Sequence, residues 1–84
     1  MTGEQVADIR KALGEAIGHR LSASEFGQMI GLAELSANRT IRRWEDEGPS
    51  GPGGFALRLI KACIDAGRVD LVVASTLKLP ERRA

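Results

Sequence analysis

Three arginines stand close together in the stretch ANRTIRRWEDEG, which covers residues 37–48. No acid separates Arg39, Arg42 and Arg43, whereas three acids directly follow the tryptophan. Each guanidinium group offers a planar fork of N–H donors that matches phosphate oxygens, carboxylates and the acceptor edge of guanine. The spacing therefore predicts a surface that binds an anionic or acceptor-rich partner. An ordinary solvated helix face is the alternative, because such faces are commonly charged.

The same stretch contains residues that can hold it to a core. Ile41 and Trp44 lie three positions apart, so they share one side of a helix, mostly opposite the arginines. We expect Trp44 to be buried there rather than stacked on a base. Ser36 is expected to cap this helix at its start, and Gly48 is expected to end it.

Two helices are expected before this stretch, over residues 2–17 and 23–30. Both begin with a capping-box pattern, a hydroxyl residue followed three positions later by Gln or Glu: Thr2 with Gln5, and Ser22 with Glu25. Gly27 lies inside the second helix, where glycine costs about 1 kcal/mol relative to alanine. A small residue at this position predicts the close approach of another helix.

The C-terminal part of the chain is apolar and interrupted by glycines. Residues 48–54 have the composition of a loop, and residues 55–66 are expected to form a fourth helix. Residues 69–79 form a fifth apolar segment, whose β-branched residues would also suit a strand, and residues 80–84 are expected to be a tail. The expected apolar stripe of the fourth helix consists of Phe55, Leu59, Ile60, Cys63 and Ile64.

Composition narrows the classes of function. A chain of 84 residues has room for one domain, which we assign to residues 1–84, and its net charge is only +1. Cys63 is the only cysteine and His19 the only histidine in the sequence. An internal disulfide is therefore excluded, and a zinc site built from Cys and His is nearly excluded. The sequence has no signal-peptide pattern and no membrane-spanning run, so we expect a cytoplasmic protein. No catalytic constellation stands out, so we expect no enzyme, cofactor, metal or small-molecule ligand.

The two central helices, with a glycine between them, have the pattern of a helix-turn-helix. The segments LSASEFGQMIGL and RTIRRWEDEG resemble the lambda-repressor-like group, the Cro/Xre type of phage and bacterial DNA-binding regulator. The resemblance covers residues 5–66. It implies an all-α domain of four to five short helices, with the helix-turn-helix at residues 22–47.

The chain departs from the family pattern in two places. Gly27 stands where the family normally has alanine. The separation between Gly31 and Arg39 is also a few residues longer than in the family. Either the turn is longer, or the third helix starts earlier.

The resemblance also implies roles for individual residues. Carried over by position, the side that faces a DNA groove consists of Ala37, Asn38, Arg39, Arg42 and Arg43. Base contacts are expected from Asn38, Arg39 and Arg42. Phosphate contacts are expected from Ser22, Ser24, Thr40 and Arg43. Arg10 and Glu45 match positions that often pair in this family, and with Ile41 and Trp44 they are the expected structural residues.

The expected function is sequence-specific binding of double-stranded DNA by a transcriptional regulator, often a repressor in this family. A phage control protein, an antitoxin and an autorepressor all fit this expectation. Such domains usually bind inverted repeats as homodimers, with recognition helices about 34 Å apart. Residues 55–79 carry more apolar side chains than one small core needs, so we expect the dimer interface there, at Leu71, Val72 and Leu77. The alternative function is a helical protein-interaction module whose basic helix docks an acidic partner protein.

Overall fold

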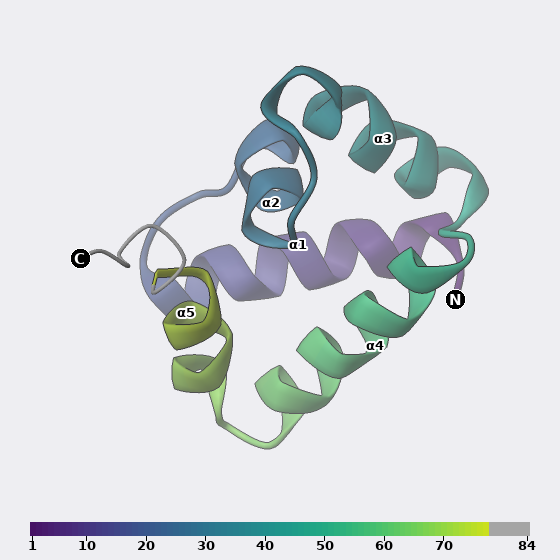
Figure 1. Ribbon diagram of the computed structural model, residues 1–84. Coiled ribbons are helices and arrows are strands. Elements are labelled where there is room, and N and C mark those ends of the chain that lie inside the picture. Colours follow the sequence, from purple (N-terminus) through teal and green to yellow (C-terminus); the bar gives the residue numbers. More distant parts are fainter. Residues whose placement is uncertain (78–84) are drawn as a thin grey trace.

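The computed structural model describes residues 1–77, and the side chains of residues 1–74. The described chain consists of five helices: α1 (Gly3–Ile17), α2 (Ala23–Met29), α3 (Glu34–Glu47), α4 (Pro52–Asp65) and α5 (Val69–Leu77) (Figure 1). The prediction of an all-α fold is confirmed for these residues, and the segment that begins at Val69 is a helix rather than a strand. The predicted tail at residues 80–84 lies outside the described residues.

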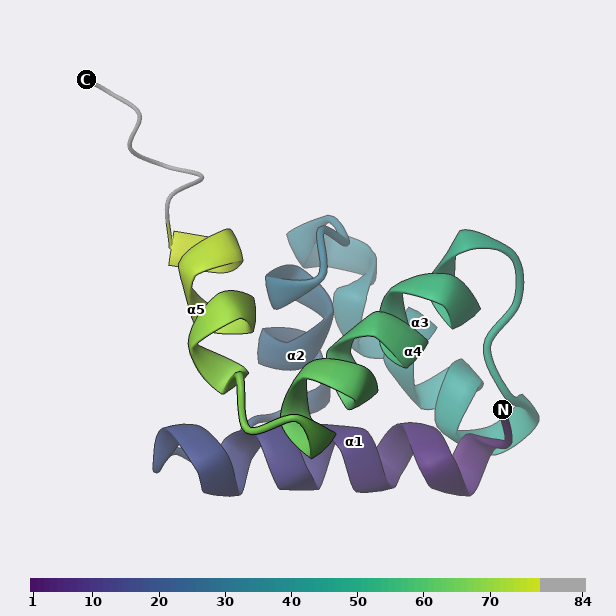
Figure 2. The same cartoon turned by 90° about the horizontal axis from the view of Figure 1, so that it is seen from below.

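Helix α1 lies along one edge of the molecule, with the other helices on the same side of it, as Figure 2 shows. Its predicted capping box is present: the Thr2 hydroxyl accepts from the Gln5 N–H at 3.2 Å, and Gln5 Oε1 accepts from the Thr2 N–H at 2.8 Å. Gly18 ends the helix in the left-handed conformation, with φ +75°. Helix α1 packs against α3, α4 and α5, so it connects the pair of α2 and α3 with the two C-terminal helices.

Helices α2 and α3 form a closely packed pair. Ser22 caps α2 as predicted, with Glu25 completing the capping box. A β-carbon built on Gly27 would lie 2.7 Å from the Ala37 Cβ and 3.1 Å from its Cα. The prediction that another helix approaches α2 closely at Gly27 is therefore confirmed, and that helix is α3.

The predicted start of α3 is wrong. The helix begins at Glu34 rather than after Ser36, and its N-cap, Ala33, makes no side-chain capping bond. The Ser36 hydroxyl instead donates to the Ala33 carbonyl oxygen at 3.3 Å, from inside the first turn. The additional residues before Arg39 thus belong to the helix, and the connection from α2 is short. Gly48 follows the last residue of α3 with φ +93°, as predicted.

The predicted start of α4 is also wrong. Residues 52–54 belong to the helix rather than to a loop, because Pro52 occupies the first turn, where its fixed φ is favourable and its missing N–H costs nothing. Gly53 lies against the ring of Trp44, so closely that a β-carbon at this position would overlap with the indole.

The predicted apolar stripe of α4 is wrong at two of its residues. Phe55 and Leu59 are exposed, at 60% and 52%, whereas Leu57 and Ile60 are buried. Cys63 and Ile64 are partly buried and pack against the core. The helix therefore turns a different face inward, and an apolar stripe remains on its outside.

The core lies between α1 and the four helices above it. Every helix contributes to it: Val6, Ile9, Leu13, Leu21, Ala23, Phe26, Ile41, Trp44, Leu57, Ile60 and Val72. Ile41 is fully buried and Trp44 is 7% exposed, so the prediction that both residues face inward is confirmed.

Moving the methyl group from Ala37 to Gly27 tests the close contact between α2 and α3. We expect Gly27→Ala to destabilise the fold by about 1–2 kcal/mol, because overpacking outweighs the gain in helix propensity. Adding Ala37→Gly should recover part of that loss, since the second substitution removes the colliding methyl group. Chemical denaturation of the two single variants and the double variant measures the effect. A Gly27→Ala variant at least as stable as the wild type would contradict the close contact.

Candidate nucleic-acid interface

The exposed side of α3 carries one continuous row of side chains. Leu35, Asn38, Arg39 and Arg42 are all exposed, and their spacing of i, i+3, i+4 and i+7 places them on the same side of the helix. The opposite side is buried and consists of Ala37, Ile41 and Trp44. We call the exposed row the α3 row. Its chemistry runs from an apolar side chain at the start of the helix, through an amide, to two guanidinium groups.

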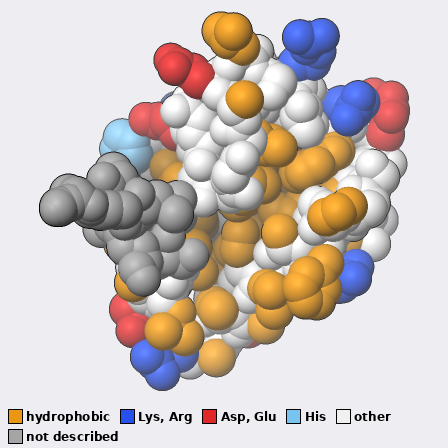
Figure 3. Space-filling view, in the orientation of Figure 1, with side chains coloured by type: hydrophobic (Ala, Val, Ile, Leu, Met, Phe, Trp, Pro, Cys, Tyr) orange, Lys and Arg blue, Asp and Glu red, His pale blue; other side chains and the backbone are white. Residues whose placement is uncertain are grey.

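The three arginines are the cationic side chains of α3. Within the described residues, Arg39, Arg42 and Arg43 take part in no ion pair, and all three are exposed. Basic side chains stand on the outer side of α3 in Figure 3. The acids Asp46 and Glu47 lie at the C-terminal end of the helix, beyond the row. The positive charge is thus concentrated in the middle of α3, between Glu34 in its first turn and the acids at its C-terminal end.

One residue of the expected groove-facing side is placed wrongly by the family resemblance. Ala37 is fully buried, and its methyl group lies against Gly27 of α2. The cause is steric: the two helices approach so closely that the residue at this position must be small and must face inward. Asn38, in contrast, is exposed beside Arg39.

Arg10 and Glu45 form the predicted ion pair. The Arg10 Nε lies 2.7 Å from Glu45 Oε2, and Nη2 lies 3.2 Å from Oε1, so the two groups meet in a bidentate arrangement. Arg10 Nη1 also donates to the Leu21 carbonyl oxygen at 2.9 Å. The two side chains are only 25% and 15% exposed. Arg10 therefore ties α1, the segment before α2 and the end of α3 together, which is a structural role.

The first turn of α1 also packs closely against the last turn of α3. A β-carbon on Gly3 would overlap with the backbone carbonyl of Glu45. Only glycine allows the first turn of α1 to approach the last turn of α3 in this way. The C-terminal end of α3 is consequently fixed on α1, while Ala37 packs its N-terminal half against Gly27 of α2.

The predicted phosphate-binding serines lie at the start of α2. The Ser22 hydroxyl accepts from the Glu25 N–H at 3.0 Å, and the Ser24 hydroxyl accepts from Gln28 Nε2 at 3.1 Å. Each hydroxyl acts as acceptor in these bonds, so its hydrogen is left to donate. The hydrogen bond from the Ser22 N–H, and then contact with His19 at 3.3 Å, lower the pKa of Glu25, so a negative charge stands beside them.

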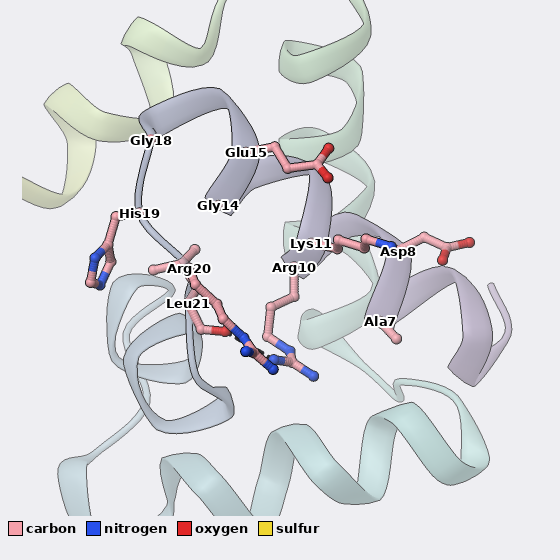
Figure 4. Close-up of a pocket in the computed structure, with 10 residues that line it drawn as sticks. All are labelled: Ala7, Asp8, Arg10, Lys11, Gly14, Glu15, Gly18, His19, Arg20 and Leu21. Atoms are coloured by element: carbon pink, nitrogen blue, oxygen red, sulfur yellow. Dashed lines mark hydrogen bonds between the residues drawn. The ribbon is translucent and has the colours of Figure 1, made fainter.

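Arg20 is a cation next to the start of α2 that sequence reasoning missed. Arg20 is exposed, precedes α2, and lines a cleft beside α1 together with Arg10 and Lys11 (Figure 4). It takes part in no ion pair within the described part of the chain. The other predicted phosphate contacts lie on α3, where Thr40 is half-buried and Arg43 is exposed.

Leu35 is the second residue that sequence reasoning missed. A helix capped by Ser36 would exclude Leu35, but Leu35 lies in the first turn of α3 and is 95% exposed. Its spacing to Asn38 and Arg39 was a signal present in the sequence, and it becomes readable only once the helix is known to begin at Glu34.

The predicted dimer residues have three different outcomes. Leu71 is 49% exposed, whereas Val72 is buried in the chain's own core and is therefore not available at a surface. The side chain of Leu77 lies outside the described residues. The largest exposed apolar side chains nearby are on α4, where Phe55, Leu59 and Ala62 follow one another at helical spacing. We call these three residues the α4 stripe. Figure 3 shows hydrophobic side chains gathered over this helix.

Comparisons with protein-family models, curated proteins and solved structures find no match to the chain. Within residues 1–77, no helix has the length and apolar character needed to cross a membrane. The described residues also contain no group of three or more His, Cys, Asp or Glu side chains that could hold a metal ion.

A double-mutant cycle on Arg10→Gln and Glu45→Gln tests the structural pair. We expect each single variant to lose about 1–3 kcal/mol of unfolding free energy, because the partner left behind is partly buried. The coupling energy should exceed about 1 kcal/mol. The exposed pair of Lys61 and Asp65, 2.7 Å apart, is the matched control, and its cycle should give no more than about 0.5 kcal/mol. Equal coupling in the two cycles would show that Arg10 does not tie the helices together.

Proposed function

We propose that this protein binds double-stranded DNA sequence-specifically, as a transcriptional regulator, by placing α3 in the major groove. The α3 row carries the proposal. Asn38, Arg39 and Arg42 are aligned on one exposed side of a helix, and the two arginines have no ion-pair partner among the described residues. The major groove is about 12 Å wide and admits one α-helix. Arginine forks match guanine O6 and N7, and asparagine matches adenine N6 and N7.

The position of α2 supports the same proposal. In a helix-turn-helix the first helix crosses the DNA backbone while the second enters the groove. Here a short connection joins α2 to α3, and the start of α2 presents Ser22, Ser24 and the nearby Arg20. These groups suit phosphate contacts, which position a protein on DNA without reading its sequence.

The low net charge of +1 does not oppose DNA binding, because the charges are unevenly distributed. Glu45 is neutralised by Arg10, and Asp65 and Asp70 are paired with Lys61 and Arg68. The arginines of α3 have no such internal partners among the described residues. The surface that meets DNA is therefore more basic than the chain as a whole.

We further propose that two copies assemble through the α4 stripe. Phe55 and Leu59 expose large apolar side chains on the outside of α4, and Leu71 of α5 is exposed as well. A second copy packed there would bury them and provide two recognition helices. Two-fold symmetry would match an inverted repeat with half-sites about one helical turn apart.

Selection of bound duplexes from a random pool tests DNA recognition. We expect an enriched inverted repeat whose affinity falls by a log–log salt slope of about −0.9 per phosphate contacted. Arg39→Ala and Arg42→Ala should each lose about 1–3 kcal/mol and relax the preference at one base pair. Arg43→Ala should weaken all sequences alike. If no sequence is enriched and an acidic polypeptide competes equally well, the protein-interaction module is the better description.

Charge placed on the α4 stripe tests dimerisation. We expect Leu59→Glu to leave the fold intact, because Leu59 is half exposed, and to convert the dimer into a monomer in sedimentation equilibrium. Lys61→Glu places the same charge on the same helix but off the stripe, and it should remain dimeric. A wild-type protein that is monomeric at tens of micromolar would contradict this assembly.

A further inference from the structure

Leu35 is the most exposed large apolar residue in the described chain. Its side chain is 95% exposed, against 60% for Phe55 and 52% for Leu59. Single exposed leucines are common on protein surfaces, so exposure alone implies nothing. What distinguishes Leu35 is its register, because it begins the α3 row rather than joining the apolar side chains of α4 and α5.

The register places Leu35 at the end of α3 that reaches base edges. The N-terminal residues of a recognition helix are those that contact bases. From Leu35 to Arg42 the helix rises by about 10 Å, which corresponds to roughly three base-pair steps. A helix lying in the groove with its two arginines on base edges therefore brings Leu35 to a neighbouring base pair.

The major groove offers one apolar feature that a leucine can contact. The edge of thymine carries a C5-methyl group, whereas the edges of the other three bases present polar N7, O6, N4 or N6 groups. Leucine has no donor or acceptor, so packing it on a polar edge removes water without replacing its hydrogen bonds. Packing it on a methyl group instead buries apolar surface on both sides.

We propose that Leu35 selects thymine through its 5-methyl group, an inference that rests on the proposed binding of DNA. The α3 row then reads three kinds of base edge in a fixed order along the helix. Leu35 takes a thymine methyl group, Asn38 an adenine, and the arginines guanine. The thymine lies within about four base pairs of the position read by Arg39.

Replacing thymine by deoxyuridine removes this methyl group and leaves the hydrogen-bonding edge unchanged. The probe is the best duplex selected from the random pool, resynthesised with deoxyuridine at one thymine position at a time. We expect one position in each half-site to bind the wild-type protein about four-fold more weakly when substituted, the effect of losing one buried methyl-sized contact. Leu35→Ala should bind the thymine and deoxyuridine duplexes equally.

Two variants serve as controls. Leu35→Met keeps an apolar side chain and should retain sensitivity to deoxyuridine. Arg39→Ala should weaken binding overall but leave the deoxyuridine effect unchanged, because a different side chain contacts the methyl group. Circular dichroism should show the same helix content in all variants, since Leu35 and Arg39 are exposed.

The outcomes separate this inference from the proposed function. If a specific duplex binds but no deoxyuridine position matters, or if the effect persists in Leu35→Ala, then DNA binding stands and the role of Leu35 is overturned. If no duplex is enriched from the pool, the proposed function fails and the inference fails with it.

Discussion

The position of α3 depends on three glycines that approach it from three different helices. Gly27 of α2 lies against Ala37, Gly53 of α4 lies against the Trp44 ring, and Gly3 of α1 lies against the Glu45 carbonyl. At each of these sites a β-carbon would come within overlap distance of α3. The helix is thus held by close approach at these glycines as well as by the buried side chains of Ile41 and Trp44. Because these contacts lie on one side of α3, its other side remains exposed.

Electrostatics divides α3 along its length, whereas packing divides it into a buried and an exposed side. Its C-terminal end carries three acids, one of which is bound to Arg10, its first turn carries Glu34, and the arginines lie between them. The bidentate pair fixes the end of the helix that packs on α1, while the arginines face outward. A charge balance close to zero therefore hides a strongly polarised helix, and the net charge is a poor guide to the surface that meets a partner.

The parts of the fold that were predictable from sequence are those set by local chemistry. The capping boxes at Thr2 and Ser22 define the starts of α1 and α2, because the residues that satisfy the first N–H groups lie within the same four positions. The start of α3 has no such signal, since Ala33 offers no capping side chain. The glycines after Pro52 have loop composition, yet Gly53 and Gly54 both belong to α4, and Gly53 packs against the Trp44 ring.

The candidate site was predictable in part for similar reasons. Helical periodicity correctly placed Ile41 and Trp44 inward and the arginines outward. For α4, however, both Phe55 with Leu59 and Leu57 with Ile60 fit a helical period, and only packing against α1 decides between them. The pair of Arg10 and Glu45 is 35 residues apart in sequence, and only family resemblance predicted it.

The most direct test of the central claim is an NMR titration of the ¹⁵N-labelled protein with its selected duplex. If α3 is the reading helix, the largest shifts of backbone amides should fall in residues 34–43, with smaller shifts at the start of α2 around Ser22. The amides of α1 that face away from α3 should be unaffected. Shifts centred on α4 and α5, with residues 34–43 unchanged, would contradict the account.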